Sequence, residues 1–395
     1  MKQSLHTILF LIIVSIWTIQ VNAKPIVPGD DNQVLEILPV KMISSVEREA
    51  LRKAHKAWQS DPKNIYAVNA LARLYIAQSR QLADPRYLGY AEALLEPWVK
   101  MPKIPTAIRI LRATILQRNH QFDAALAEIK NILGDDPTEP EALLMQATIL
   151  QVRADYEGAR KSCKRLYSFS TLIIGMACTA QIDGLTGHAV SAFEQISTLL
   201  NLKNAGLTAE VRNWMRLIHI DLAQRLGRED EVARGFKTLL SEHASLPSEA
   251  RIQYADWLIL NGRFQDVVDI GVHALHDDGT LLRLVIAEEA LRLPEAAIHR
   301  TLLHDRFAAA KLRGDSIHQR EESRFRLEVM HQPKEALVLA QANWAIQREP
   351  ADARVLLAAA LKSGQPSAAQ PILQWLKDSH IEDADLIQQS HAVLQ

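Results

Sequence analysis

The chain has 395 residues, of which 48% are hydrophobic and 23% charged, with 15 Gly and 16 Pro. This composition excludes a collagen-like or disordered chain, and the length favours several domains or a repeat array over one compact core. Lys and Arg number 45 against 46 Asp and Glu, a net charge of -1. Nucleic-acid binding favours a basic surface, so we expect no nucleic-acid partner.

The first segment, residues 1–23, has the layout of a secretory signal peptide. Lys2 precedes the apolar run Ile8–Ile19, and Val21-Asn22-Ala23 places small residues before a cleavage point. The apolar run is shorter than the ~20 residues needed to cross a bilayer, which argues against an uncleaved anchor. We therefore expect export, to the periplasm if the source is bacterial, and no integral membrane span once the signal is removed.

A repeat becomes visible in the letters ATILQ, which occur at Ala113 to Gln117 and again 34 residues later at Ala147 to Gln151. The phase continues on both sides, because Ala125 pairs with Ala159 and Phe122 with Tyr156 at the same offset. Within each unit, apolar residues recur at helical spacing on two segments that are separated by a short polar turn. One unit is therefore predicted to be a helical hairpin.

This unit resembles the tetratricopeptide repeat, a 34-residue helix-turn-helix. The resemblance rests on small residues where the two helices touch, Ala113 and Ala125 in one unit, on an aromatic residue that opens the second helix, and on Pro137 at its end. It implies an all-α, right-handed solenoid of eight or nine such hairpins. The consensus Trp and Gly of the first helix are absent from the clear units, which leaves the family boundary open.

The same phase organises most of the mature chain. After a flexible lead-in at 24–43, we expect the solenoid to span 44–395. The clearest repeats fall at 104–168 and 205–280, whereas the segment 281–331 loses the phase and is predicted to be irregular.

No catalytic motif stands out, and we expect neither a cofactor nor enzymatic activity. His273 and His276 lie three residues apart beside Asp277 and Asp278, which could gather a metal ion. The simpler interpretation is that these residues serve the helix ends, where His and Asp are common. A metal-binding protein or an enzyme with a site in the irregular segment 281–331 remains the alternative.

The two cysteines, Cys163 and Cys178, fall in consecutive helices on either side of a turn. An antiparallel pair brings them to a similar height, so a disulfide can form in an oxidising compartment if their Cα atoms come within about 7 Å. Two buried thiols are the other interpretation and the slightly favoured one, because Cys is a common core residue.

The resemblance also implies a function, since the first helices of stacked hairpins line a concave groove that holds a peptide or a partner's helix. By the family's geometry, these groove positions are Asn69, Arg73, Ile110, Thr114, Gln117, Arg118, Leu144, Thr148, Gln151, Trp214, Leu217, Asp221, Gln224, Arg225, Ile252, Asp256 and Ile259. The set is mixed in charge and lacks the residues that clamp a C-terminal carboxylate. We expect an exported, non-enzymatic scaffold for a partner protein or extended peptide, and assembly of an envelope or secretion complex is an extension by analogy. Self-association of the array is a further possibility, and the sequence leaves the oligomeric state open.

Overall fold

The computed structural model describes residues 44–82, 84–167, 172–202, 206–243, 245–313 and 319–394. The signal peptide and lead-in predicted at 1–23 and 24–43 lie outside these residues. Val46–Gln395 forms one compact unit, and the following description concerns this unit.

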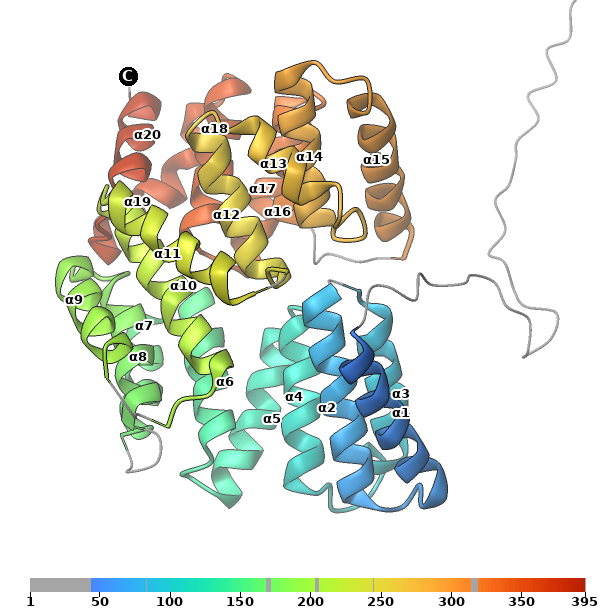
Figure 1. Cartoon of the computed structure of the whole chain (residues 1–395). Coiled ribbons are helices and arrows are strands. Elements are labelled where there is room, and N and C mark those ends of the chain that lie inside the picture. Colours follow the sequence, from blue (N-terminus) through green and yellow to red (C-terminus); the bar gives the residue numbers. More distant parts are fainter. Residues whose placement is uncertain are drawn as a thin grey trace, which may run out of the picture. The chain divides into compact units, whose positions relative to one another are not determined.

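The described residues form α-helices joined by short turns, with one 3-10 turn before α19 (Figure 1). The helices are α1 (Ser45–Ser60), α2 (Ile65–Leu82), α3 (Arg86–Val99), α4 (Thr106–Arg118), α5 (Phe122–Asp135), α6 (Pro140–Val152), α7 (Tyr156–Arg165), α8 (Leu172–Asp183), α9 (Ala189–Leu200), α10 (Ala209–Arg225), α11 (Glu229–Glu242), α12 (Ser248–Leu260), α13 (Phe264–Gly271), α14 (Asp278–Leu291), α15 (Ala296–Arg313), α16 (Gln319–Glu328), α17 (Pro333–Ile346), α18 (Pro350–Lys362), α19 (Gln370–Ser379) and α20 (Ala384–Leu394).

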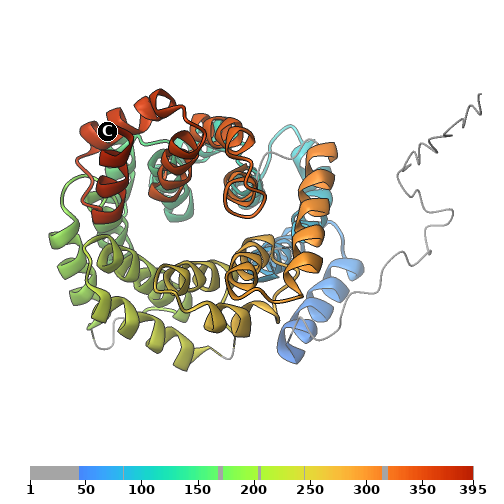
Figure 2. The same cartoon turned by 90° about the horizontal axis from the view of Figure 1, so that it is seen from above.

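Consecutive helices pack in pairs, from α2 with α3 to α18 with α19, and α1 and α20 stand at the two ends of the array. We call the even-numbered first member of each pair helix A and the second member helix B. Each helix A also contacts the helix A of a neighbouring pair, as α12 does with α14 and α14 with α16. The predicted all-α solenoid of tetratricopeptide-like hairpins is therefore confirmed, and its helices follow a curved path in Figure 2.

Small side chains allow the paired helices to approach closely. Ala113 and Ala125 of one pair, and Ala147 and Ala159 of the next, are at most 1% exposed. A larger side chain at these positions would hold the helices apart, because protein interiors are close-packed. These alanines occupy the positions that the 34-residue repeat assigned to helix contacts.

The turn between helix A and helix B repeats one backbone motif. Each described turn contains a residue with positive φ. This residue is glycine in some turns, with φ of +67° at Gly227 and Gly262, and another residue in others, with φ of +54° at His120 and +62° at Ala154. The amide of the next residue then donates back into helix A, as Gln121 does to the Leu116 carbonyl at 2.9 Å. This is the Schellman arrangement, which satisfies the last carbonyls of a helix.

The segment predicted to be irregular, 281–331, keeps this architecture. It contains most of α14, the 18-residue α15 and all of α16, and its turns take positive φ at Arg292 and His331. The repeat is longer here: its two turn residues lie 39 residues apart, whereas His120 and Ala154 lie 34 residues apart. The sequence loses the phase because the repeat length changes, while the helical pairing continues.

Helices far apart in the sequence also touch, because the array curves back on itself. The Arg348 amide donates to the Val152 carbonyl at 2.7 Å, and Trp375 Nε1 donates to the Tyr156 hydroxyl at 2.9 Å. These contacts join the α17–α19 region to the ends of α6 and α7.

The structure joins Cys163 of α7 to Cys178 of α8 by a disulfide, with the Cα atoms 5.5 Å apart. This differs from the slightly favoured interpretation of two buried thiols. The reason is geometric, since α7 and α8 pack against one another and place both cysteines in the same core cluster.

Candidate binding pocket on the helix A face

A pocket of about 430 Å³ opens on the face formed by the later A helices. Its walls come from α10, α12, α14, α16 and α18, and the terminal helix α20 completes it. The lining residues are Asp221, Gln224, Arg225, Gln253, Asp256, Ile259, Leu260, Arg283, Arg320, Glu321, Arg324, Leu327, Glu328, Ala351, Arg354, Val355, Leu357, Ala358, Leu361, Lys362, Gln389 and Ala392. The volume lies within the range of sites that take small molecules or a few side chains.

One spacing explains which residues face the pocket. In α18, Arg354 is followed by lining residues 4, 7 and 8 positions later, at Ala358, Leu361 and Lys362. Residues at these separations lie on one face of a helix, which has 3.6 residues per turn. The same spacing from Arg320 in α16 reaches three further lining residues, Arg324, Leu327 and Glu328.

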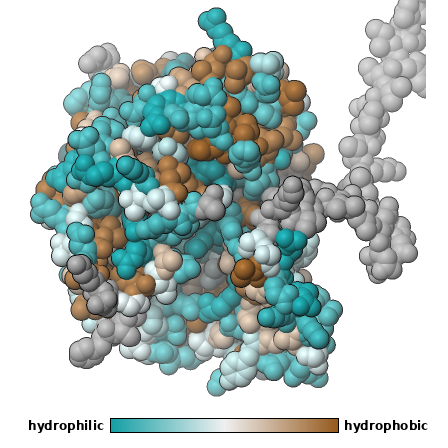
Figure 3. All heavy atoms as spheres, viewed as in Figure 1, coloured by the Kyte–Doolittle hydropathy of each residue, from teal (hydrophilic) through white to brown (hydrophobic). Residues whose placement is uncertain are grey.

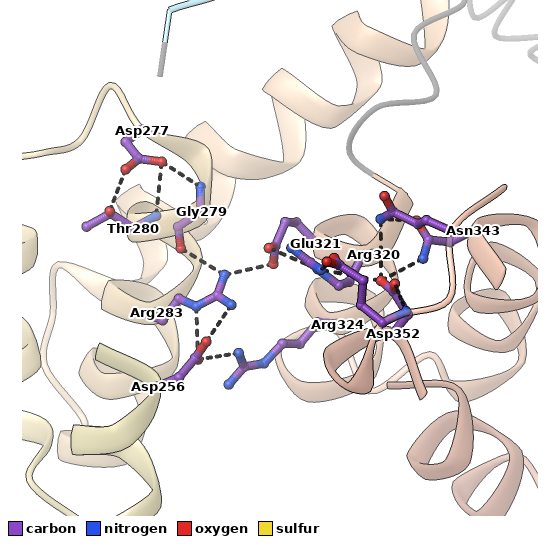
Figure 4. A network of polar contacts seen from close by, with 12 residues as sticks. Asp256, Asp277, Gly279, Thr280, Arg283, Arg320, Glu321, Arg324, Asn343 and Asp352 are labelled. Carbon is purple, nitrogen blue, oxygen red and sulfur yellow. Dashed lines mark hydrogen bonds and ion pairs between the residues drawn. The ribbon is translucent and has the colours of Figure 1, made fainter. Parts of the chain in front are cut away.

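A network of ion pairs forms the charged wall, with Arg283 at its centre (Figure 4). Arg283 donates to both carboxylate oxygens of Asp256, at 3.0 and 2.8 Å, and to Glu321 at 2.7 Å. Arg324 reaches the same Asp256 carboxylate and also Glu328. Burial opposes the ionisation of Asp256, but the two arginines hold its pKa well below its usual range. The wall is therefore ionised and internally paired.

Beside this wall, Arg320 lies within reach of two acids at the start of α18. Its Nη1 is 3.3 Å from Glu349 and 3.4 Å from Asp352. Glu349 and Asp352 form a reciprocal capping box, in which each carboxylate accepts from the other residue's backbone amide. Burial, reinforced by the charge of Asp352, raises the pKa of Glu349 to about 7 in spite of Arg320. Glu349 therefore holds its proton more tightly in the folded protein than an exposed glutamate does.

Five of the groove residues named from the sequence line this pocket: Asp221, Gln224, Arg225, Asp256 and Ile259. Arg225 is almost wholly buried, because it donates to Asp221 and to the Gly184 carbonyl. The structure therefore brings together the members from α10 and α12.

The other named positions lie outside the pocket. Ile110 is only 6% exposed and belongs to the core beneath α4, so it does not present a side chain to a groove. Thr114 and Thr148 each donate to the carbonyl four residues earlier in their own helix, and Arg73 pairs with Glu141 at 2.9 Å.

The remaining named residues are partly buried. Trp214, Leu217, Leu144 and Ile252 pack largely against neighbouring helices, while Asn69, Gln117 and Gln151 keep part of their surface exposed. Arg118 is a separate case, since its Nε is buried without a hydrogen-bond partner among the described residues. Burial, and then the charge of Arg80, lower the pKa of Arg118.

Sequence reasoning missed the half of the pocket that α14, α16, α18 and α20 supply. Arg283, Arg320 and Arg324 lie in the segment whose phase was lost, and Arg354 lies in a repeat for which no groove position was named. The available signal was the shared spacing of 4, 7 and 8 residues from Arg320 and from Arg354.

The histidine and aspartate cluster considered as a metal site has structural partners. Asp277 accepts from the amides of Gly279 and Thr280 and from Arg251 at 2.8 Å, and Asp278 pairs with Arg306. Across the described ranges, no group of three or more His, Cys, Asp or Glu is placed to hold a metal ion. No helix in this part of the chain is long and apolar enough to span a membrane.

Comparisons with known proteins give a likeness among solved structures. No protein-family model matches the chain, and no curated protein matches it. The crystal structure of the tetratricopeptide repeat domain of P58(IPK) is similar at 18% sequence identity, covering 81% of this chain and 94% of that chain, with a TM-score of 0.21. By its own consecutively paired helices, the chain is a tetratricopeptide-like repeat protein.

Proposed function

We propose that the protein is an exported, non-enzymatic scaffold that binds a segment of a partner protein on its helix A face. The observation that carries this proposal is the pocket between α10 and α20, in which large apolar side chains remain exposed. Leu260 is 65% exposed and Leu361 is 47% exposed, and both line the pocket. Exposed aliphatic groups in a concave site are typical of surfaces that a bound partner covers.

The charged residues of the pocket fit binding better than catalysis. Asp256 and Glu321 are each held by buried arginines, so neither carboxylate is poised to exchange a proton near neutral pH. Hydrophilic and hydrophobic residues are interspersed on the face drawn in Figure 3.

Export is supported by the N-terminal layout of the sequence and by the cysteine pair. Disulfides persist in oxidising compartments and are rare in the cytosol. The disulfide between Cys163 and Cys178 therefore favours a location outside the cytoplasm. Participation in assembling an envelope or secretion complex is part of this proposal.

In-cell photo-cross-linking tests the scaffold proposal. A photoreactive amino acid replaces Leu260 in one variant and Val338, an exposed residue of α17 that does not line the pocket, in the control. We expect a discrete adduct with one partner from position 260 and none from 338. Capture from 338 with none from 260 would contradict the proposal, and metal analysis of the same preparation tests the metal-site alternative.

A further inference from the structure

The pocket has an apolar stripe along α18. Val355, Ala358 and Leu361 all line it, and Leu260 faces it from α12. The aliphatic ends of Leu260 and Leu361 remain largely in solvent. Each square ångström of apolar surface that a ligand removes from water contributes roughly 25 cal/mol. This part of the pocket is therefore suited to an aliphatic side chain.

Two cations border this stripe on the same helix. Arg354 and Lys362 are eight residues apart, or about 12 Å along the axis at 1.5 Å per residue. The side chain of Arg354 is 30% exposed, whereas its ion-pair partner Asp383 is fully buried. Lys362 is exposed and has no ion-pair partner among the described residues. Both cations line the pocket, while Asp383, the acid that pairs with Arg354, is not among its lining residues.

Charges on the opposite walls are paired within the pocket itself. Asp221 lies against Arg225, and Asp256 against Arg283. Since both members of these pairs line the pocket, they offer a ligand no net charge. The α18 edge is the part of the pocket with a local electrostatic preference, and that preference is for an anion.

A third feature points to a peptide. Gln389 lines the pocket from α20, and its Oε1 is buried without a hydrogen-bond partner among the described residues. A buried acceptor left unpaired is costly. A ligand that turns this side-chain amide toward the pocket and donates an N–H group to its oxygen therefore gains affinity, and the backbone amide of a peptide is such a donor.

We propose that the pocket binds a partner segment in which an aliphatic side chain lies beside Asp or Glu. The aliphatic group packs on Leu260 and Leu361, and the carboxylate pairs with Lys362, while Arg354 adds positive charge at the other end of the stripe. A backbone amide donates to the Gln389 oxygen once that side chain turns toward the pocket. This inference rests on the proposed scaffold function and names the chemistry of its ligand.

Peptide selection tests directly whether the pocket prefers an aliphatic side chain beside Asp or Glu. A random heptapeptide library displayed on phage is selected against the purified mature protein, and the selected sequences are synthesised for fluorescence-anisotropy titration. We expect enrichment of peptides with an acidic residue next to Leu, Ile or Val. Selection of basic or uncharged peptides overturns the proposal, and so does a library that yields no binder.

Matched variants locate the binding. Lys362→Glu and Lys377→Glu each reverse an exposed lysine in the last turn of a helix, but only Lys362 lines the pocket. We expect Lys362→Glu to weaken binding roughly tenfold and Lys377→Glu to leave it within about twofold. Leu361→Ser tests the apolar contact. Because Leu361 is exposed, we expect this variant to fold. Equal affinities for wild type and Lys362→Glu overturn the proposal.

The failure of this inference can be separated from failure of the scaffold function. If the photoreactive residue at 260 captures a partner whose cross-linked segment is basic or uncharged, the scaffold stands and the acidic preference is wrong. If capture occurs only from Val338, the scaffold proposal itself fails.

Discussion

Replacing Asp256 by alanine is the sharpest test of the charged wall. The Asp256 carboxylate accepts two hydrogen bonds from Arg283 and one from Arg324. Without it, the Arg283 guanidinium, which is only 5% exposed, keeps Glu321 as its sole acidic partner among the described residues. Removing one member of a buried pair costs about 3–5 kcal/mol, because the other charge remains desolvated.

The expected loss lies at the lower end of that range. Asp256 is itself 30% exposed, and Glu321 still neutralises part of the Arg283 charge at 2.7 Å. We therefore expect Asp256→Ala to lower the free energy of unfolding by about 3 kcal/mol. Urea unfolding of the mature protein followed by circular dichroism measures this loss.

Glu328→Gln provides the matched control for this measurement. Glu328 lies in the same network but, among the described residues, it pairs only with Arg324, four residues earlier, and it is 33% exposed. We expect a cost of about 0.5 kcal/mol, as for exposed helix pairs. If Asp256→Ala costs no more than Glu328→Gln, the network does not hold α12, α14 and α16 together as described.

Three further predictions follow from particular contacts. Replacing Cys163 and Cys178 by alanine should cost about 3 kcal/mol, the loop-closure value for the observed separation of 15 residues; two reactive thiols in the denatured, unreduced wild type would refute the bond. Because burial raises the pKa of Glu349 from 4.5 to about 7, the folded state binds this proton more tightly, and its contribution to stability should decline as pH rises from about 4.5 through 7. Urea midpoints at pH 5 and 8 should therefore differ less in Glu349→Gln than in wild type, and an unchanged difference contradicts the assignment. Tyr156→Phe removes the acceptor of Trp375 Nε1 and should cost about 1–2 kcal/mol, with faster amide exchange in α7 and α19; unchanged exchange there would show that the contact does not join these helices.

The repeat unit could be predicted from the sequence because its determinants are local. The 34-residue offset between the ATILQ segments placed Ala113 and Ala147 at helix contacts, and both are at most 1% exposed. Glycine in the turns, as at Gly227 and Gly262, marked two hairpins. Arg292 and His331 take the same positive φ 39 residues apart, so the 34-residue phase is lost there although the fold continues.

The binding pocket could be predicted only in part, because it depends on how successive repeats curve. Asp221 and Asp256 were found through the repeat phase, whereas their arginine-rich surroundings come from later helices that the phase did not reach. Contacts between distant repeats, such as Tyr156 with Trp375, depend on the summed curvature of the array. No local sequence pattern encodes the curvature that the repeats add up to.

If the partner binds on the helix A face, photo-cross-linking from Leu260 should give one discrete adduct in the exported protein. Lys362→Glu should reduce this adduct, and Lys377→Glu should not. An adduct that forms only from Val338 on α17 would contradict binding on the helix A face, whereas an adduct from position 260 that is indifferent to Lys362→Glu would contradict the acidic preference alone.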